Sequence, residues 1–144
     1  GICDTGLWGG LMNQMARQKK LGGIILDGGV RDCQELAASD FPVFARAISP
    51  QGGFKASPGS VNIPISCGGV PVLPGDLVVG DADGVVVVPS AQAKEILEKS
   101  LGVVQKEKEL RERMGRGEQL YSLLKLDGAP ETLGMIVNRV DTMK

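Results

Sequence analysis

The residues best placed for chemistry are Arg31 and Asp32, which stand side by side after an apolar segment. That segment predicts a strand over 23–26 that runs into a tight turn at Gly28 and Gly29. A strand end that presents adjacent opposite charges can bind a small anion or a metal ion. The same residues also fit an ordinary strand-to-helix junction, in which Asp32 is the N-cap of a helix and Arg31 is solvated.

The absence of histidine narrows the chemistry that such a site can perform. It excludes Ser-His-Asp and Cys-His catalysis, and it excludes histidine-ligated zinc. Cys3, Cys33 and Cys67 are odd in number and show no CxxC spacing, which favours a reducing, cytoplasmic setting. Any metal must be held by carboxylates, carbonyls and water, which are the ligands of hard cations such as Mg²⁺ or Mn²⁺.

The composition is that of one globular domain and argues against two classes of partner. The chain has 144 residues, of which 42% are hydrophobic and 23% are charged, and its net charge is −1. Basic residues are clustered on only one predicted helix and aromatic residues make up 3% of the chain, so we expect no direct nucleic-acid binding. No apolar run reaches the roughly 18 residues that cross a bilayer, so we expect no membrane partner.

The segment before the Arg31–Asp32 pair predicts a helix over 9–20. Its expected apolar face comprises Leu11, Met12, Met15 and Ala16. At its start, Gly9 and Gly10 carry no bulky side chains, so the first backbone N–H groups can bind an anion. The alternative is that both glycines only allow tight packing under Trp8. The segments that follow predict a helix over 33–38, a strand over 41–46 and a loop over 49–59 that borders a site.

The second half of the chain predicts short strands and then one long helix. Turn residues separate four strand candidates, which predict an antiparallel array of hairpins in a barrel or sandwich, at 62–66, 70–73, 77–80 and 85–88. Asp81 and Asp83 resemble a metal loop, but ordinary turn chemistry is the stronger interpretation. We expect Ser90 to cap a helix over 91–116 that Gly117 ends.

Glu107 is the one carboxylate on the apolar stripe of that long helix. It falls between Val103 and Leu110, at the spacing that faces a packing partner. A carboxylate on an apolar face either pairs with an opposite charge or works in a site. Both interpretations remain open from the residues alone.

Three segments of the chain resemble the RraA-like family: GGIILDGGVRD at 22–32, FPVFAR at 41–46 and VNIPISCGGVPVLPGDLVVGDADGVVVVP at 61–89. That family includes 4-hydroxy-4-methyl-2-oxoglutarate and 4-carboxy-4-hydroxy-2-oxoadipate aldolases and the regulator of ribonuclease activity A. The resemblance implies an α/β fold, a swivelling β/β/α domain with short-stranded sheets or a barrel and a long C-terminal helix. We assign 1–126 to this domain and 127–144 to a C-terminal tail. Members usually carry several dozen residues before this point, so we expect an N-terminal part to be missing.

The resemblance also implies a class II aldolase, in which a divalent metal (Mg²⁺ or Mn²⁺) and no lysine Schiff base stabilises the enolate. Asp32 matches the metal-binding aspartate, and Arg31 matches the arginine that holds the substrate carboxylate. The helix start that binds the pyruvyl end through backbone N–H groups matches Gly9, Gly10, Leu11 and Met12. Many family aldolases have an acidic residue at the position of Gly10. Glu107 is our candidate for a glutamate contributed by the C-terminal helix of a neighbouring subunit.

The expected reaction is cleavage of a 4-hydroxy-2-oxo acid to pyruvate in a homotrimer or hexamer with sites between subunits. Oxaloacetate decarboxylation is an expected side activity, because it passes through the same enolate. The alternative is a non-catalytic regulator that binds and inhibits a ribonuclease. The intact Arg31–Asp32 pair favours the enzyme, because a docking protein has no chemical need for it.

Overall fold

The structure is a computed structural model that describes residues 1–54, 58–127, 133 and 134. The chain divides into two compact units, Gly1–Ala93 and Lys94–Lys144, and each is described by itself. Most of the segment that we assigned to the C-terminal tail lies outside the described residues.

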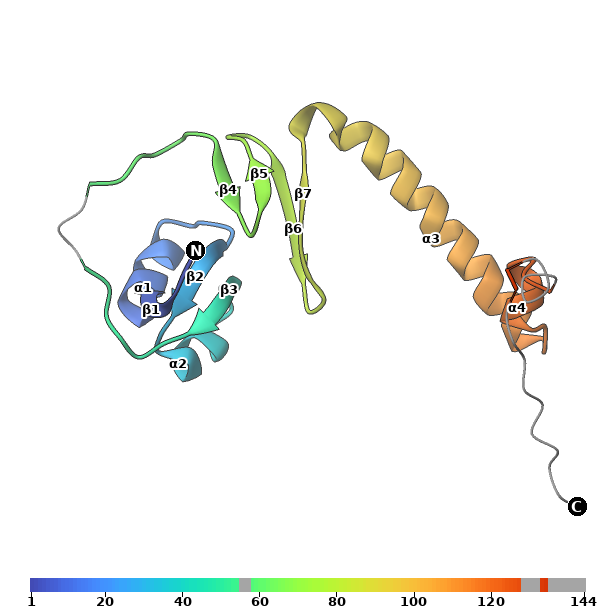
Figure 1. The fold of residues 1–144 in the computed structure, drawn as a ribbon, viewed down its shortest axis with the longest axis horizontal. Helices are drawn as coiled ribbons and strands as arrows, with labels where there is room; N and C mark the ends of the chain where they lie inside the picture. Colours follow the sequence, from blue (N-terminus) through green and yellow to red (C-terminus); the bar gives the residue numbers. More distant parts are fainter. Residues whose placement is uncertain (55–57, 128–132, 135–144) are drawn as a thin grey trace, which may run out of the picture. The chain divides into compact units, whose positions relative to one another are not determined.

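The first unit begins with three parallel strands connected by two helices (Figure 1). The elements follow one another as β1 (Ile2–Trp8), α1 (Gly10–Gln18), β2 (Ile24–Val30), α2 (Cys33–Ala37) and β3 (Val43–Ile48). The strands form one sheet in the order β1-β2-β3, with both pairs parallel. Because the carboxyl ends of parallel strands meet at one edge of a sheet, the residues that follow the strands gather there.

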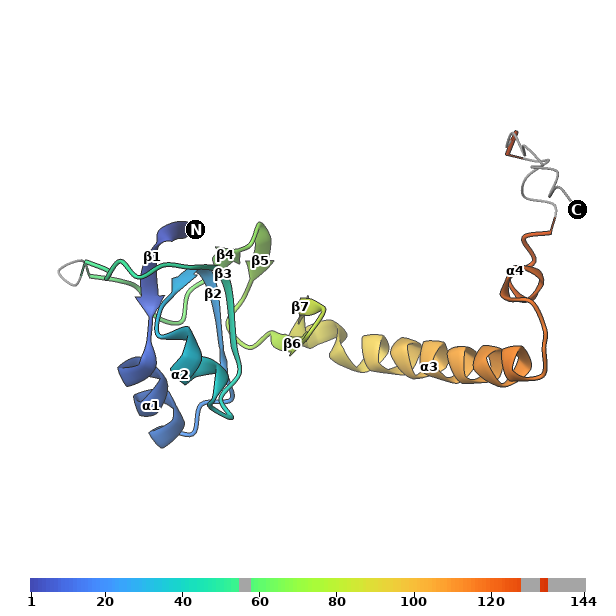
Figure 2. The ribbon, with the colours of Figure 1, turned by 90° about the horizontal axis from the view of Figure 1, so that it is seen from below.

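A small core joins this sheet to the two helices, which lie next to each other (Figure 2). Its buried members are Trp8 of β1, Ala16 of α1, Val30 of β2, Leu36 of α2 and Phe41, which precedes β3. The rings of Trp8 and Phe41 stack with their centroids 6.5 Å apart. Asn13 is buried beside them, where its amide donates to the Ser39 hydroxyl at 3.1 Å and accepts from the Trp8 indole at 3.5 Å. These bonds satisfy a polar group that would otherwise be costly to bury.

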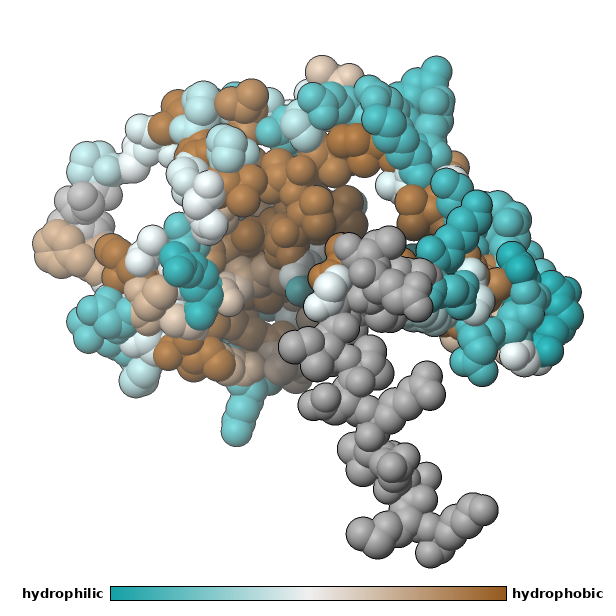
Figure 3. Space-filling view, turned by 45° about the vertical axis from the view of Figure 1, so that its right-hand side comes forward, coloured by the Kyte–Doolittle hydropathy of each residue, from teal (hydrophilic) through white to brown (hydrophobic). Residues whose placement is uncertain are grey.

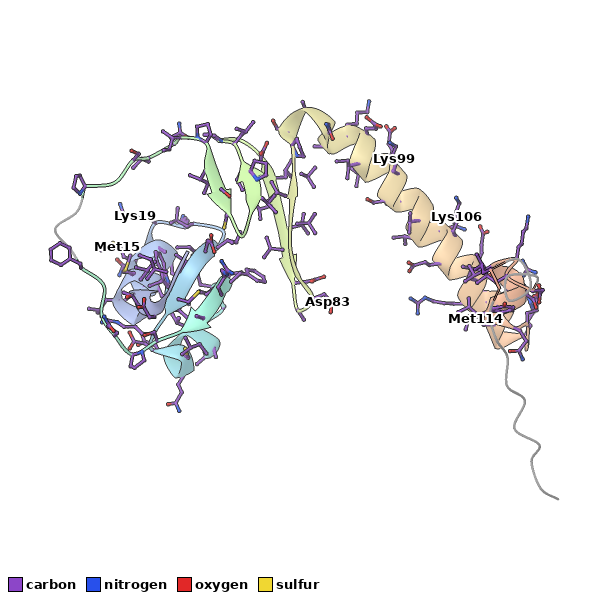
Figure 4. The ribbon with its side chains drawn as sticks, viewed as in Figure 1. Met15, Lys19, Asp83, Lys99, Lys106 and Met114 are labelled. Carbon is purple, nitrogen blue, oxygen red and sulfur yellow. The ribbon has the colours of Figure 1, made fainter. Side chains whose placement is uncertain are left out.

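The predicted helix over 9–20 is confirmed as α1, but of its predicted apolar face only Ala16 is buried. The residues of α1 that face the core are Gly10, Asn13 and Ala16, at a spacing of three. Leu11 is 83% exposed, and Met12 and Met15 are also exposed (Met15 is labelled in Figure 4). Small side chains at the contact let the helix approach the core closely, and the two hydrogen bonds of Asn13 hold it there. Leu11 and Met12 are thereby left at the surface.

The predicted turn at Gly28 and Gly29 is also wrong, because β2 continues through both glycines to Val30. Neither glycine has a positive φ, so their role is not conformational freedom. A Cβ on Gly29 would lie 2.5 Å from the carbonyl oxygen of Thr5, and one on Gly28 would lie 3.0 Å from that of Ile2. The two glycines therefore allow the backbone of β1 to approach β2 at a point where the register of the pair shifts.

Two antiparallel hairpins follow, as predicted: β4 (Ile65–Cys67) with β5 (Val70–Val72), and β6 (Leu77–Asp81) with β7 (Gly84–Val88). Within the described ranges the hairpins stay separate sheets and close no barrel. At the tip of the second hairpin the N–H of Asp83 donates to the Asp81 carboxylate at 2.9 Å (Figure 4). This is the turn chemistry that we expected there.

An apolar groove of 510 Å³ lies between the hairpins and strands β2 and β3. The side chains that line it include Leu26, Phe44, Ile65, Val72, Val78 and Val87. Figure 3 shows the broad apolar surface that such residues create. Close packing also limits which residue can stand at position 80, because a Cβ on Gly80 would lie 2.6 Å from the ring of Phe44. The second hairpin thus approaches the Phe44 ring of β3 closely at Gly80.

The second unit is dominated by α3 (Ala93–Gly115), followed by the short helix α4 (Leu120–Leu123). Ser90 is not the N-cap of α3, because it starts a separate 3-10 turn and donates its N–H to the Asp76 carboxylate at 3.2 Å. Gly117 ends the helical region as predicted, with φ at 93°. No residue of α3 is buried, so its apolar stripe is exposed. Among the described residues, no helix combines the length and apolarity needed to span a membrane.

We expect Gly29→Ala to destabilise the first unit by about 1–3 kcal/mol, because the new methyl group overlaps the Thr5 carbonyl and neither backbone can move freely. Gly22→Ala is the matched control, since a Cβ there meets no atom within 4 Å. Urea unfolding followed by circular dichroism measures both variants. Equal stability of the two would contradict a close approach of β1 and β2.

Candidate functional site

Arg31 and Asp32 lie directly after β2, at the edge of the sheet where the carboxyl ends of the strands meet. The N–H of Arg31 donates to the carbonyl of Trp8 at 2.9 Å, which fixes the backbone against the end of β1. Asp32 then turns into the left-handed conformation, with φ at 58°. Its carboxylate accepts a hydrogen bond from the N–H of Gly10 at 3.0 Å. The pair is thus held against the first turn of α1.

The interpretation of Asp32 as the N-cap of its own helix is not confirmed. Its side chain makes no capping bond to α2, although it stands at the position before that helix. It caps α1 instead, by accepting the N–H of Gly10. The N-cap residue of α1 is Gly9, which has no side chain that could accept such a bond. A carboxylate at a helix N-terminus is also favoured by the partial positive charge there.

Glycines make room for the Arg31 side chain. A Cβ on Gly9 would lie 2.5 Å from the Asp32 carboxylate and 3.1 Å from Nε of Arg31. A Cβ on Gly6 would lie 3.0 Å from Cβ of Arg31, and one on Gly52 would lie 3.1 Å from its Nη1. The Arg31 side chain therefore runs past Gly6, Gly9 and Gly52, where a larger residue would crowd it.

Arg31 and Asp32 form only a long, partly exposed ion pair with each other. Nε of Arg31 is 3.7 Å from the Asp32 carboxylate, and the side chains are 42% and 45% exposed. The Asp27–Arg46 pair is closer, because Nη1 of Arg46 is 2.9 Å from the Asp27 carboxylate. The hydrogen bond from Arg46, and after it the one from the Gly68 N–H, lowers the pKa of Asp27 to about 2. Asp27 and Arg46 already satisfy each other, whereas Arg31 and Asp32 keep capacity for a ligand.

A pocket of 340 Å³ brings together most of the predicted substrate-binding residues. Its walls include Gly9, Leu11, Met12 and Arg31, together with Phe54 from the loop after β3. Gly10 is not part of this wall, and its N–H is bonded to the Asp32 carboxylate. A neighbouring hollow of 380 Å³ is lined by both Arg31 and Asp32, together with Ser49 and Pro50. The loop predicted over 49–59 therefore borders the site in its described part.

Glu107 lies on α3, in the second unit. Its carboxylate is 3.6 Å from Nη2 of Arg111, one helical turn later, and its side chain is 57% exposed. The ion-paired interpretation thus accounts for its place on the apolar stripe. Its contribution to a neighbouring subunit's site stays a prediction.

Glu35 lies beside the candidate site, and the sequence reasoning did not single it out. It is exposed in the first turn of α2, three residues after Asp32. A Cβ built on Gly10 would overlap its carboxylate. The signal in the sequence was a second acid near the Arg31–Asp32 pair, but only the packing of α2 against α1 directs it to Gly10.

These residues suit an open site for a hard cation and no closed metal cage. The described part of the chain holds no group of three or more Cys, Asp or Glu side chains that could bind a metal alone. Asp32 offers an exposed carboxylate whose Oδ2 holds the Gly10 amide. Mg²⁺ commonly takes one or two carboxylates and keeps several waters, which fits this donor set.

The protein has a mixed α/β architecture: a parallel sheet with an arginine and an aspartate at the end of one strand, then two hairpins and a long helix. The model of the RraA-like family (Aldolase/RraA) matches residues 1–87 of the chain. The chain belongs to the RraA-like family.

Known proteins are similar to this chain over most of its length, in sequence or in structure. An uncharacterized protein of Methanocaldococcus jannaschii is 40% identical over 88% of the chain and 61% of its own length. A Halalkalibacterium halodurans protein, provisionally named 4-hydroxy-4-methyl-2-oxoglutarate aldolase, is 42% identical over 69% of the chain and 48% of its own. The crystal structure of Streptomyces coelicolor RraAS2, described as an unusual member of the RNase ES inhibitor RraA family, matches with a TM-score of 0.70. That match has 34% identity and covers 76% of this chain and 56% of that one. The chain thus spans less than two thirds of each relative.

We expect Asp32→Asn to leave the free energy of unfolding nearly unchanged and Asp32→Ala to lower it by about 1–2 kcal/mol. Asparagine tolerates the left-handed conformation at position 32, and its side-chain oxygen still accepts the Gly10 bond, whereas alanine is strained there. Denaturant unfolding of both variants checks this difference. Equal losses would show that the conformation of Asp32 does not constrain the residue type.

Proposed function

We propose that the protein is a divalent-metal-dependent class II aldolase that cleaves a 4-hydroxy-2-oxo acid to pyruvate. The observation that carries the proposal is the meeting of an exposed arginine and an exposed aspartate at the open N-terminus of α1. The family assignment and the name of the H. halodurans relative support it.

Arg31 would bind the carboxylate of the oxo acid, because a guanidinium donates two parallel hydrogen bonds to a carboxylate. The glycine-lined path of its side chain leaves the guanidinium at the border of both hollows. Within α1, the first intrahelical bond is donated by Asn13 to Gly9, so the amides of Leu11 and Met12 point out of the helix start. They would add donors for the pyruvyl oxygens.

Asp32 would hold Mg²⁺ or Mn²⁺, and the cation would supply stabilisation for the negative charge of the enolate. The Gly10 hydrogen bond orients the Asp32 carboxylate for this role, since it fixes Oδ2 at a known position. Oxaloacetate decarboxylation is proposed as a side activity because it generates the same enolate. A trimeric or hexameric assembly, in which Glu107 reaches a neighbour's site, belongs to the same proposal.

The second candidate is a regulator that binds a ribonuclease without catalysing a reaction. The observation that favours it is the similarity to RraAS2, which is described as a member of an RNase inhibitor family. The two candidates differ in their demand on Arg31 and Asp32, because docking to a protein surface does not require a cation site.

We expect pyruvate release from 4-hydroxy-4-methyl-2-oxoglutarate in the presence of Mg²⁺ or Mn²⁺, and none after chelation. Arg31→Ala should lower kcat/KM about 10–100-fold, the value of one charge-assisted carboxylate contact. Asp32→Asn should lower kcat about 1000-fold or more, because the charge that holds the cation is lost while the backbone conformation is kept. A lactate dehydrogenase-coupled assay measures all three proteins.

Lys19→Ala is a control that removes an exposed cation at the other end of α1 (labelled in Figure 4), and its kcat/KM should stay within about twofold. Wild-type turnover in Asp32→Asn would contradict the metal assignment. Absence of turnover on any 2-oxo acid, together with tight binding to a ribonuclease, would favour the regulator.

A further inference from the structure

The pocket of 340 Å³ at the start of α1 has a single charge in its wall. Among the described residues, Arg31 is the one charged residue that lines it, and every other lining residue is a glycine or is apolar. The apolar ones come from β1, from α1 and from the loop after β3, and they are Leu7, Trp8, Leu11, Met12 and Phe54. The indole N–H of Trp8 already donates to Asn13 at 3.5 Å. The pocket therefore offers one guanidinium and a broad apolar wall.

This apolar wall is open to water in the structure. Phe54 is 87% exposed and Leu11 is 83% exposed, and Leu7 and Met12 are exposed as well. An apolar group that covers these side chains leaves water, and each CH₂ group that it buries strengthens binding about fourfold. A carboxylate placed against the same wall loses hydration without gaining a partner. The wall thus favours a ligand with an apolar end.

A ligand with two carboxylates would find a free partner for only one of them. Arg31 is the proposed partner of the carboxylate next to the oxo group. The other two arginines of the described first unit are already paired, because Arg17 is 2.6 Å from the Asp40 carboxylate and Arg46 is 2.9 Å from the Asp27 carboxylate. One available arginine matches a substrate with one carboxylate.

The position of Asp32 indicates which end of a substrate would meet the apolar wall. Asp32 lines the neighbouring hollow of 380 Å³ together with Arg31, and it does not line the apolar pocket. A cation on Asp32 would bind the oxo-acid end, because carboxylate and oxo oxygens are hard ligands. The opposite end, beyond the hydroxyl-bearing carbon, would then extend past Arg31 to Leu11 and Phe54.

We propose that the preferred substrates are 4-hydroxy-2-oxo acids with a single carboxylate and an apolar alkyl or aryl substituent on the hydroxyl-bearing carbon, and that Phe54 and Leu11 bind this substituent. This inference rests on the proposed aldolase function and narrows its substrate class. The pocket volume is near the lower end of the range of ligand sites, about 300–1,000 Å³, which suits a short substituent. Acids with a second carboxylate, such as 4-hydroxy-4-methyl-2-oxoglutarate, are then the weaker substrates.

Cleavage of such an acid breaks the bond between the hydroxyl-bearing carbon and the adjacent methylene. The electron pair of that bond passes to the methylene, which becomes the enolate of pyruvate and takes up one proton. The hydroxyl group loses its proton, and its oxygen becomes the carbonyl oxygen of an apolar aldehyde or ketone. No oxidant or reductant is required.

The test compares the binding of two 2-oxo acids of similar shape that lack the hydroxyl group and so cannot undergo this cleavage. 5-Methyl-2-oxohexanoate carries an isopropyl group where 2-oxoglutarate carries its second carboxylate. Trp8 is the one tryptophan of the chain and lines the pocket, so its fluorescence reports the binding of either acid in buffer with Mg²⁺. 5-Methyl-2-oxohexanoate should bind about 10-fold or more tightly than 2-oxoglutarate, because its isopropyl group is buried against the apolar wall.

Phe54→Ala should weaken the binding of 5-methyl-2-oxohexanoate about 5–20-fold and that of 2-oxoglutarate less than about twofold. Val61→Ala is the matched control, since it trims an apolar side chain that is 89% exposed and does not line the pocket. It should change both affinities less than about twofold. Both variants should remain folded by circular dichroism, because neither side chain is buried.

The outcomes separate this inference from the proposed function. Equal or tighter binding of 2-oxoglutarate, in a protein that releases pyruvate from 4-hydroxy-4-methyl-2-oxoglutarate, would overturn the apolar preference and leave the aldolase function in place. Equal losses for both acids in Phe54→Ala would overturn the role of Phe54 in selectivity. Failure to bind either acid, together with no pyruvate release, would overturn both the apolar preference and the proposed function.

Discussion

The hydrogen bond from the Gly10 amide to the Asp32 carboxylate is the interaction on which the site depends. It joins the end of β2 to the beginning of α1, two elements that are adjacent only because β1 and β2 run parallel. A carboxylate that ends a strand is normally solvated or caps the helix that follows it. Here it caps the neighbouring helix, and the left-handed backbone of Asp32 turns it in that direction. The same bond that stabilises the helix start orients the proposed cation ligand.

Close backbone approach is the second constraint, and glycine is how the sequence meets it. Gly29 allows β1 to come against β2, which sets the distance between Trp8 and Arg31. Gly6, Gly9 and Gly52 leave the space through which the Arg31 side chain runs. A methyl group at any of these places would move either a strand or one of the two charges. The high glycine content is thus tied to the site as well as to the turns.

Gly10 stands at the position for which the family resemblance implies an acidic residue in many aldolases. Glycine at position 10 carries no side chain, but a negative charge is still present there, because the Glu35 carboxylate occupies that space. An acid supplied from α2 instead of α1 approaches from a different direction.

The sequence by itself determined the order of the elements and the class of chemistry. Periodicity and turn residues located α1, α3 and both hairpins, since these depend on contacts between residues that are near in the chain. The lack of histidine limited any metal to oxygen ligands, and the Arg31–Asp32 pair marked the candidate site. These conclusions hold because residue types and short-range spacing are enough to support them.

Only the tertiary structure decided which faces are buried and which groups meet. The core face of α1 is Gly10, Asn13 and Ala16, because close packing favours small residues and a satisfied amide over the larger apolar ones. Gly28 and Gly29 lie within a strand, because their neighbour is the backbone of β1, which no local pattern reveals. The bonding of Asp32 to α1 and the approach of Glu35 to Gly10 join residues more than 20 positions apart. Such contacts are set by the parallel pairing of strands and by steric fit, and neither is written in the local sequence.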